Sequence, residues 1–457
     1  MAIDSGRSPI KLAPHPEEQP TAQQSLNCSP SLVMFQAIFN PHCEPNYMTD
    51  KNAKSFTTPR DLPTDICVVG GAGHIGLPLA ILLASKGKRV VAYDLNTAVL
   101  EEVRQGKMPF KEEGAQELLT EVLKTGLLGL SNNPASVQDA KTIIVTIGTP
   151  VDEFHNPSLA AIKKCFLDLS PYLSEEQLVV LRSTVSPGVT EWIDSYLKSI
   201  GKNLKVAFCP ERVVQGLAIK ELQQFPQIIS ATSKEAENEA ARLFEELCPE
   251  VVRLTPTEAE FAKLFANAYR YIQFAMANQF YMIANNAGVD YYRVLDGLKK
   301  NYPRARDIPK AGFAAGPCLF KDTMQLVAFS NNQFSLGHSA VLINEGLVLY
   351  IADQIAAKHP LADMTIGLLG MAFKSETDDV RSSLSYKLKK VLDFKAKSVL
   401  CTDPYVETDK TLLPVDEVIR RSDLLVLCTP HEQYKSLDLG DKPLVDVWGF
   451  RKTGTLV

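Results

Sequence analysis

Short continuous runs of apolar residues recur between residues 65 and 252, and segments with helical spacing of apolar positions separate them. An uninterrupted apolar run of this kind is typical of a strand buried on both faces. The runs that we interpret as strands are Ile66 to Val69, Arg89 to Tyr93, Thr142 to Ile147, Leu178 to Leu181 and Val206 to Phe208. Repeated strand–helix–strand units predict a parallel, doubly wound α/β sheet, which binds its ligand at the carboxyl ends of the strands. Three residue pairs follow such strand ends, namely Thr149-Pro150, Ser183-Thr184 and Pro210-Glu211.

A second series of apolar runs begins at Thr365. The expected strands are Thr365 to Gly370, Ser398 to Cys401, Leu424 to Leu427 and Leu444 to Val447. Asp403 follows the second of these strands, as Asp94 follows the second strand of the first series. The pseudo-repeat is coarse, but it predicts two Rossmann-like α/β domains and two nucleotide ligands.

Between the two series, Glu258 to Gly288 has a helical pattern without Pro, which predicts one long spanning helix in a central helical domain. Glu260, Lys263, Asn267 and Arg270 share one face of it. Such a polar stripe is either a solvated face or the wall of a site, and the pattern alone favours the solvated face. The helix is also apolar on more than one side, which predicts a homodimer through the central helix.

The clearest motif follows the first strand. Gly71, Gly73 and Gly76 form G-x-G-x-x-G between a strand and a helix, and Asp94 ends the next strand. We assign the tight turn to Gly71, close approach of a pyrophosphate to Gly73, and helix–strand packing to Gly76. His74 and Ile75 lie inside the motif and count among the predicted cofactor-binding residues. An acid at the position of Asp94 accepts ribose hydroxyls and repels an extra phosphate, so the pattern predicts NAD. The alternatives are a glycine-rich turn of another α/β domain, or a transmembrane helix, which the glycines and Pro78 disfavour.

Composition narrows the function class. The chain has 457 residues, of which 45% are hydrophobic and 22% charged, and its net charge is −5. With this net charge the chain has no overall basic field, which gives no indication of nucleic acid or an anionic membrane as a partner. Nine cysteines without a C-x-x-C pair fit a reducing cytosol, and the seven histidines show no metal spacing, so we expect no metal. We detect no secretory signal and expect a cytoplasmic protein.

The first 63 residues are rich in Pro, Ser, Gln and Asn and show no periodicity, which predicts a disordered tail. Its one apolar patch, Leu32 to Phe39, is a candidate docking helix, and Met48 is an alternative start. With this tail, the expected domains are residues 1–63, an NAD-binding domain at 64–254, a central helical domain at 255–350, and a C-terminal α/β domain at 351–457.

Taken together, these motifs resemble those of the UDP-glucose/GDP-mannose dehydrogenase family, from Ile66 to the end of the chain. Besides the glycine fingerprint, the matching segments in family order are Thr149-Pro150, Ser183-Thr184-Val185, Cys209 to Arg212, Ala259 to Lys263 with Asn267, Gly316 to Cys318 followed by Lys321-Asp322, and Leu369 to Lys374 with Thr377 to Arg381. The resemblance implies oxidation of C6 of a nucleotide-linked hexose to a carboxylate, with two NAD per turnover. It also implies that the C-terminal domain at 351–457 binds the nucleotide sugar (UDP).

By this resemblance, Cys318 is the nucleophile that holds the aldehyde as a thiohemiacetal and then as a thioester. Lys263 and Asn267 would stabilise the oxyanions, and Asp322 would act on the hydrolytic water. Glu211 and Thr184 would line the reacting carbon. The alternative for Cys318 is an inert buried thiol.

The resemblance also implies the binding residues. Lys374 and Arg381 would contact nucleotide phosphates, and Arg304 would reach the sugar, across a dimer in related enzymes. The remaining expected contacts are Thr149, Thr184, Lys321 and Arg381 for the cofactor and Glu211, Arg212, Lys263 and Asn267 for the substrate. For each charged residue the alternative is a surface salt bridge.

Departures from the family pattern leave the catalytic groups in place: Ala315 replaces a glycine, Pro317 replaces Ser or His before the cysteine, and Gln279 replaces Glu. The form Pro210-Glu211-Arg212 resembles enzymes of N-acetylated hexosamines, so we expect UDP-N-acetylmannosamine or UDP-N-acetylglucosamine, with UDP-glucose as the alternative. More remote alternatives are a two-electron hydroxyacid dehydrogenase and an inactive nucleotide-sugar-binding protein.

Overall fold

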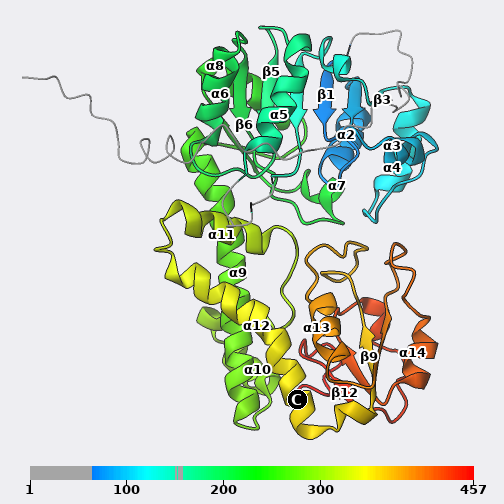
Figure 1. Cartoon of the computed structure of the whole chain (residues 1–457). Coiled ribbons are helices and arrows are strands. Elements are labelled where there is room, and N and C mark those ends of the chain that lie inside the picture. The colour runs from blue at the N-terminus through cyan, green and yellow to red at the C-terminus, as the bar shows by residue number, and fades with distance from the viewer. Residues whose placement is uncertain (1–63, 150–151, 153–157) are drawn as a thin grey trace, which may run out of the picture. The chain divides into compact units, whose positions relative to one another are not determined.

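The computed structural model of the chain describes residues 64–149, 152 and 158–457 (Figure 1). The predictions made for residues 1–63 and for Pro150 lie outside these residues. The residues that the structure describes all belong to one compact unit.

The first sheet has eight strands in the order β3-β2-β1-β4-β5-β6-β7-β8. They are β1 (Ile66–Val69), β2 (Val90–Tyr93), β3 (Leu128–Ser131), β4 (Thr142–Val145), β5 (Leu178–Leu181), β6 (Lys205–Phe208), β7 (Gln227–Ala231) and β8 (Val251–Arg253). The doubly wound α/β fold is confirmed, but the expectation of a wholly parallel sheet is wrong at one place, since β7 pairs antiparallel with β6. The apolar pattern did not single out β3, β7 or β8, because polar residues or glycine interrupt them.

Strand register aligns the carboxyl ends of the central strands. Val69 pairs with Tyr93 on one side and with Val145 on the other, and Leu181 pairs with both Val145 and Phe208. The residues that follow these strands therefore lie along one edge of the sheet, where a doubly wound fold binds its ligand.

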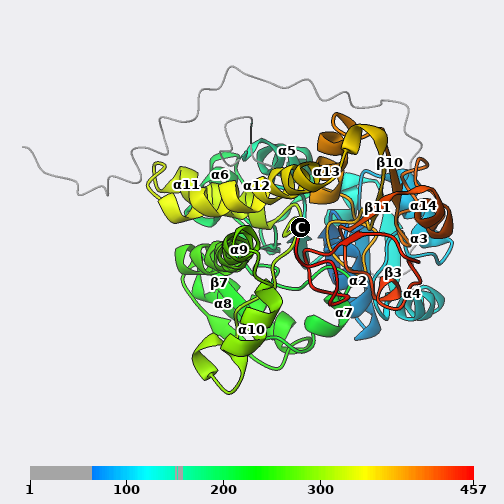
Figure 2. The same ribbon diagram turned by 90° about the horizontal axis from the view of Figure 1, so that it is seen from below.

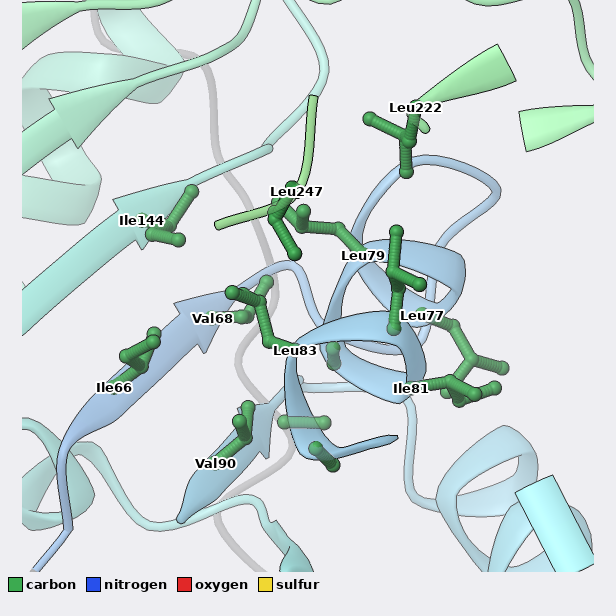
Figure 3. Close-up of a cluster of buried hydrophobic side chains, with 14 of the residues drawn as sticks. Ile66, Val68, Leu77, Leu79, Ile81, Leu83, Val90, Ile144, Leu222 and Leu247 are labelled. Carbon is green, nitrogen blue, oxygen red and sulfur yellow. The ribbon is translucent and has the colours of Figure 1, made fainter. Parts of the chain in front are cut away.

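The helices of this sheet bury their apolar sides against it. They are α2 (Gly76–Ser85), α3 (Thr97–Arg104), α4 (Ala115–Lys124), α5 (Ala160–Leu169), α6 (Val189–Ser199), α7 (Ala218–Glu221) and α8 (Lys234–Glu245). In α2 every residue except Ser85 is buried. Figure 3 shows Leu77 and Leu83 of α2 with Val68 of β1 in the same core cluster. Pro78 is tolerated because it lies in the first turn, where no intrahelical N–H bond is lost.

The middle of the unit is helical and consists of α9 (Pro256–Asn286), α10 (Tyr291–Lys299), α11 (Leu319–Phe329) and α12 (Ser335–Lys358). A capping box between Thr255 and Glu258, with Pro256 in the first turn, begins α9 two residues before the predicted start. Figure 2 shows α12 beside α9 and α11. Of the helices that the structure describes, only α12 is long and apolar enough to cross a membrane. Its buried Asn344 accepts a hydrogen bond from Asn278 of α9 (2.9 Å), so the two helices are joined by a polar contact.

The C-terminal sheet is parallel, in the order β10-β9-β11-β12. Its strands are β9 (Thr365–Leu369), β10 (Ser398–Thr402), β11 (Leu424–Leu427) and β12 (Leu444–Val445), and its helices are α13 (Leu384–Asp393) and α14 (Val415–Arg421). The segment between β9 and α13, residues 370–383, contains no helix or strand and is called the 370–383 segment below. It contains both Lys374 and Arg381.

Candidate active site

The turn between β1 and α2 leaves no room for a side chain at Gly71 or Gly76. A methyl group on Gly71 would lie 2.6 Å from Cα of Ala92, and one on Gly76 would lie 2.2 Å from the carbonyl oxygen of Gly70. Gly70, whose φ is +81°, makes the tight turn that we assigned to Gly71. Gly71 is required instead by the close approach of β2. At Gly73 the nearest atom to such a methyl would be 3.4 Å away, so the backbone there is open.

Asp94 lies beside this turn at the end of β2. Its Oδ2 accepts a hydrogen bond from the backbone N–H of Ala72 (3.0 Å), and its Oδ1 accepts one from Asn96 (2.9 Å). Each carboxylate oxygen can accept a further bond, and the residue is partly exposed. No side chain caps the N-terminus of α2 at Ile75, which leaves backbone N–H groups for a phosphate. A turn that side chains would fill, a free helix N-terminus and an available carboxylate fit NAD.

His74 of the same turn lies between the NAD-binding and C-terminal domains. Its ring packs on Phe110 with centroids 4.2 Å apart, its Nδ1 is 3.2 Å from the amide nitrogen of Gln215, and its Nε2 is 3.9 Å from Oδ2 of Asp379. Burial lowers the pKa of His74, and nearby Arg381 lowers it further. The imidazole is therefore neutral at physiological pH.

Lys321 of α11 connects this helix to the residues that follow β4 and β5. Its Nζ donates to the carbonyl oxygen (3.1 Å) and the hydroxyl (3.2 Å) of Thr149, and that hydroxyl donates to the carbonyl oxygen of Thr184 (2.6 Å). Three residues expected at the cofactor and reaction site thus lie in one hydrogen-bonded chain.

Glu211 is buried and paired with Arg182, a residue that the sequence analysis missed. The Arg182 guanidinium forms an ion pair with Oε2 of Glu211, and Oε1 of Glu211 accepts bonds from the backbone N–H groups of Arg212 (2.7 Å) and Val213 (2.9 Å). Burial raises the pKa of Glu211, but Arg182 outweighs this effect and holds the pKa below its usual value. Glu211 is therefore ionised. The sequence did contain a signal for Arg182, since an arginine that directly follows a wholly apolar strand is unusual.

The polar stripe of α9 is mostly not a solvated face, so the interpretation favoured by the pattern is wrong. Glu260 is fully buried, and its carboxylate accepts bonds from the N–H groups of Gly188 (2.6 Å) and Thr190 (2.8 Å) at the start of α6. Asn267 is buried and Lys263 is half-buried, whereas only Arg270 is exposed. Glu260 thus connects α9 to the segment that follows Thr184.

Cys318 immediately precedes α11, and Asp322 lies in the first turn of that helix. The amide nitrogen of Asn267 donates to Oδ2 of Asp322 (2.5 Å), and Nζ of Lys321 lies 3.3 Å from Oδ1. Asp322 is completely buried, yet its Oδ1 accepts no hydrogen bond from the residues that the structure describes. A buried carboxylate oxygen with a free lone pair is suited to accept a proton from water.

The Cys318 thiol is accessible at the surface, whereas Cys67, Cys209, Cys401 and Cys428 are buried. The surrounding protein raises the pKa of Cys318, and Asp322 raises it further. Lys263, Lys321 and Arg381 act in the opposite direction, which places three positive charges near the sulfur. The alternative that Cys318 is an inert buried thiol therefore does not agree with the structure. The three cations favour the thiolate form of Cys318 during an attack.

The loop before Cys318 packs against the C-terminal domain. Gly316 has φ +107°, and a methyl group on it would lie 2.7 Å from the Phe373 ring. A pocket of about 260 Å³ lies beside this loop and extends to the start of α13. Tyr271 lines the pocket, and its buried hydroxyl has no hydrogen bond among the described residues.

Lys374 and Arg381 lie in the 370–383 segment. Nζ of Lys374 donates to the carbonyl oxygen of Gln215 (2.5 Å), and burial lowers the pKa of Lys374. Arg381 forms a forked ion pair with Asp379 (2.6–3.0 Å). A carbonyl and a carboxylate thus hold both cations, as phosphate-binding residues are commonly held before a ligand arrives.

The structure does not bring two predicted residues to this site. Arg304 lies in the short 3-10 helix Pro303–Ala305 and is exposed, without an ion pair among the described residues. Arg212 is exposed, and its guanidinium donates to the carbonyl oxygen of Pro226.

Three family models of the UDP-glucose/GDP-mannose dehydrogenase family match the chain: the NAD binding domain at residues 64–248, the central domain at 257–346 and the UDP binding domain at 367–451. A UDP-N-acetyl-D-mannosamine dehydrogenase from Pyrococcus horikoshii is 30% identical over 80% of this chain and 90% of its own length. An NDP-N-acetyl-D-galactosaminuronic acid dehydrogenase from Ralstonia nicotianae is 26% identical over 83% and 95%.

Solved structures agree with these matches. That of the UDP-D-ManNAc dehydrogenase from Pyrococcus horikoshii has a TM-score of 0.79 and 29% identity, over 85% of this chain and 96% of the other. A UDP-glucose dehydrogenase from Pyrobaculum islandicum has the same TM-score at 24% identity, over 86% and 97%, and shows the common fold. The chain therefore belongs to the UDP-glucose/GDP-mannose dehydrogenase family and is an NAD-dependent nucleotide-sugar dehydrogenase.

Proposed function

We propose that the enzyme oxidises the C6 alcohol of UDP-N-acetyl-D-mannosamine, or of the related UDP-N-acetyl-D-glucosamine, to the uronic acid through a covalent adduct on Cys318. The observation that carries this proposal is the convergence of an accessible thiol, three cations, and a buried Asp322 with a free carboxylate oxygen. A two-electron dehydrogenase needs neither a nucleophile nor a hydrolytic base. An inactive binding protein would have no reason to retain both.

The turn from Gly70 to Gly76, the N-terminus of α2 and Asp94 would hold NAD. When bound, NAD would accept a hydride in each of the two oxidations. The chain's own residues act on the carbon. The alcohol first becomes an aldehyde as it loses a hydride to the cofactor and its hydroxyl proton to solvent. The sulfur of Cys318 then adds to the aldehyde carbon while the thiol proton passes to solvent, which leaves an oxyanion on the former aldehyde oxygen. The ammonium of Lys263 and the amide of Asn267 are suited to stabilise the resulting oxyanion.

Loss of the second hydride from this thiohemiacetal leaves a thioester on Cys318. Asp322 Oδ1 then takes a proton from water, the hydroxide adds to the thioester carbon, and the C–S bond breaks. The products are the uronate and the Cys318 thiol. Glu211 is ionised by Arg182 and accepts two backbone N–H bonds, so it fixes the backbone beside the site rather than donating a proton.

The choice of sugar rests on two observations. The relatives from Pyrococcus horikoshii and Ralstonia nicotianae are named for N-acetylated hexosamines. In addition, Arg212 after Glu211 departs from the Pro-Glu-Phe form that is typical of UDP-glucose enzymes. UDP-glucose remains the alternative substrate.

A panel of UDP- and GDP-sugars, with NADH formation as the measurement, tests the substrate. We expect UDP-N-acetylmannosamine or UDP-N-acetylglucosamine to be oxidised fastest, with two NADH and one uronate per sugar. A single NADH with an aldehyde or ketone product would contradict the four-electron reaction, and preference for UDP-glucose would overturn the sugar assignment.

Two variants test the covalent step. Cys318→Ser should lower uronate formation by about 10³-fold or more, because a serine hydroxyl is a weak nucleophile and its alkoxide is a poor leaving group. Asp322→Asn should form the thioester but hydrolyse it slowly, with a burst of NADH and a sugar adduct on Cys318 in the intact mass spectrum. An unmodified Cys318 in an Asp322→Asn enzyme that shows the burst would place the nucleophile elsewhere.

We also propose a homodimer through the central helices. Large apolar side chains are exposed on α9 and α12, among them Phe265, Tyr269, Ile283 and Leu342, and an exposed apolar surface of this kind commonly marks an interface. Arg304 would reach a site only across such an interface. Light scattering of active enzyme tests this proposal, and a fully active monomer would reject it. A cytoplasmic location stays a prediction.

A further inference from the structure

Glu376 has an unusual backbone conformation for its residue type. It lies in the 370–383 segment between Lys374 and Arg381, and its φ is +58°. Glycine and asparagine adopt this left-handed region readily, whereas a glutamate rarely does. A conformation of this kind persists only where the surrounding contacts determine it.

Those contacts are strong at Glu376. Its Oε2 accepts hydrogen bonds from Nζ of Lys111 (2.9 Å) and the hydroxyl of Tyr405 (2.7 Å), and its Oε1 accepts one from the backbone N–H of Glu432 (3.0 Å). Its own backbone N–H donates to Nδ1 of His431 (3.1 Å). Burial raises the pKa of Glu376, but Lys111 and Tyr405 outweigh it and lower the pKa to about 2. The carboxylate is therefore charged at every pH at which the enzyme works.

Lys111 comes from the NAD-binding domain, in the loop between α3 and α4. Besides the ion pair, its Nζ lies 3.4 Å from the centroid of the Tyr405 ring, and its backbone N–H donates to Oδ2 of Asp378 (3.3 Å). One residue thus makes three contacts with the C-terminal domain. The cation–π contact with Tyr405 and the ion pair with Glu376 need the same position of Nζ, so both interactions hold Lys111 in place.

A second connection lies next to the first. Glu112 accepts hydrogen bonds from the backbone N–H groups of Gly216 (2.9 Å) and Ala218, and the N–H of Glu113 donates to the carbonyl oxygen of Gly216 (3.0 Å). The neighbouring carbonyl of Gln215 is the one that accepts from Lys374 (2.5 Å). The loop that contains Lys111 thus also supports the turn that holds Lys374.

We propose that Lys111 and Glu376 are positioning residues, which join the NAD-binding domain to the 370–383 segment and so hold Lys374 ready for the diphosphate of the nucleotide sugar. Neither residue needs to touch the substrate. This proposal rests on the proposed function, oxidation of a UDP-sugar, and adds to it that Lys374 binds the diphosphate, as the family resemblance implies. Loss of the contact leaves the segment free to leave its left-handed conformation at Glu376, and binding then has to order it again.

Nucleotide affinity is the first test. UDP serves as the probe, because it does not depend on which sugar is the substrate. We expect Glu376→Gln and Lys111→Met to weaken UDP binding, measured by calorimetry, by about five- to tenfold, the size expected for a charged hydrogen bond that is partly exposed. KM for the UDP-sugar should rise in proportion, whereas kcat should change less than about twofold.

Two neighbouring substitutions are matched controls. Lys107→Met and Glu113→Gln remove charges from the same loop. Both side chains are exposed and form no ion pair with the C-terminal domain among the described residues, so these variants should leave UDP affinity unchanged. A double variant with the two charges exchanged, Lys111→Glu with Glu376→Lys, should bind UDP more tightly than either of the two single variants. Equal losses in the controls, or no recovery in the double variant, would refute the specific contact.

Trypsin digestion of the ligand-free enzyme provides a readout that does not involve nucleotide. Cleavage after Lys374 and Arg381 should be several-fold faster in Glu376→Gln than in the parent, because both cleavage sites remain and the segment is less restrained. Unchanged cleavage would refute the role of the contact even if UDP binding changed. Faster cleavage in an enzyme that never binds UDP would support the contact and reject the proposed nucleotide site.

Discussion

The two α/β domains place an acid at the same point of their folds but use it differently. Asp94 and Asp403 each follow the second strand and accept backbone N–H bonds from the turn after the first strand, from Ala72 (3.0 Å) in one domain and from Met371 (2.6 Å) and Ala372 (2.9 Å) in the other. Asp94 is partly exposed, whereas the side chain of Asp403 is fully buried. Only the first acid remains available to a ligand.

The oxygens of Asp403 are used inside the protein. Its Oδ1 accepts from the backbone N–H groups of Tyr405 (2.9 Å) and Val406 (3.2 Å), and its Oδ2 lies 3.1 Å from Nε2 of His431. Nδ1 of His431 accepts the N–H of Glu376, so Nε2 carries the proton that is donated to Asp403. Because both oxygens of Asp403 already accept hydrogen bonds from the protein, this acid has a structural role and does not bind a ribose.

The connections after the first strand differ as well. In the NAD-binding domain α2 begins at Gly76, shortly after β1, and no side chain caps it. In the C-terminal domain α13 begins only at Leu384, and Ser383 caps it with a hydrogen bond to the N–H of Ser385 (3.3 Å). We therefore propose that the first domain offers a phosphate its helix N-terminus, whereas the second offers cationic side chains of the intervening segment. The same topology supports two kinds of nucleotide site.

The largest expected effect is a loss of stability in the second domain. Asp403→Ala leaves His431 and four backbone N–H groups without their acceptor, so the free energy of unfolding should fall by about 3–5 kcal/mol. Asp94→Ala should lower it by about 1 kcal/mol, the size for one partly exposed acceptor. Denaturant unfolding of both variants measures this, and equal losses would remove the distinction between the two acids.

Cofactor choice should change in the first domain alone. Asp94→Ser removes the carboxylate that repels the 2′-phosphate, so the preference for NAD over NADP, measured as a ratio of kcat/KM values, should fall by about 10–100-fold. Asp403→Asn should leave this ratio unchanged. A parent enzyme that reduces NADP as fast as NAD would contradict our interpretation of Asp94.

Nucleotide affinity should change in the second domain alone. Lys374→Met removes a cation that we assign to the diphosphate, and KM for the UDP-sugar should rise by about tenfold while KM for NAD stays within about twofold. Lys389→Met, on the surface of α13, is the control. A parallel rise in both KM values would mean that Lys374 supports the fold rather than the nucleotide.

The smallest expected effect is a dependence of stability on acid. Burial raises the pKa of Asp403, but His431 and the backbone N–H groups outweigh it and hold the pKa below its usual value. The ionised form therefore stabilises the folded state above the ordinary carboxyl pKa, and this contribution is lost as pH falls through the lower folded-state pKa. Tm should fall less steeply between about pH 5 and pH 3 in Asp403→Asn than in the parent or in the surface control Asp441→Asn. Identical slopes in all three would argue against an ionised Asp403.

The sequence by itself determined the central strands, and it pointed to the residues that we propose as reacting groups. Ile66 to Val69, Leu178 to Leu181 and Leu424 to Leu427 are strands to the residue, because a strand buried on both faces needs an apolar run that is visible locally. Part of the glycine motif was visible for a similar reason, since a methyl group on Gly76 would collide with Gly70 in the same short turn. Cys318 and Asp322 came from motifs and family resemblance rather than from periodicity.

Only the tertiary structure decided which polar residues meet. Arg182 with Glu211, Glu260 with the start of α6, and Lys111 with Glu376 join segments far apart in the chain, and a pattern of apolar positions does not encode such partners. The antiparallel β7 was hidden in the same way, because strand direction depends on the connection and not on the strand. Periodicity states which face of an element is buried. Whether a charged residue on that face is solvated, paired or catalytic depends on what the fold places opposite it.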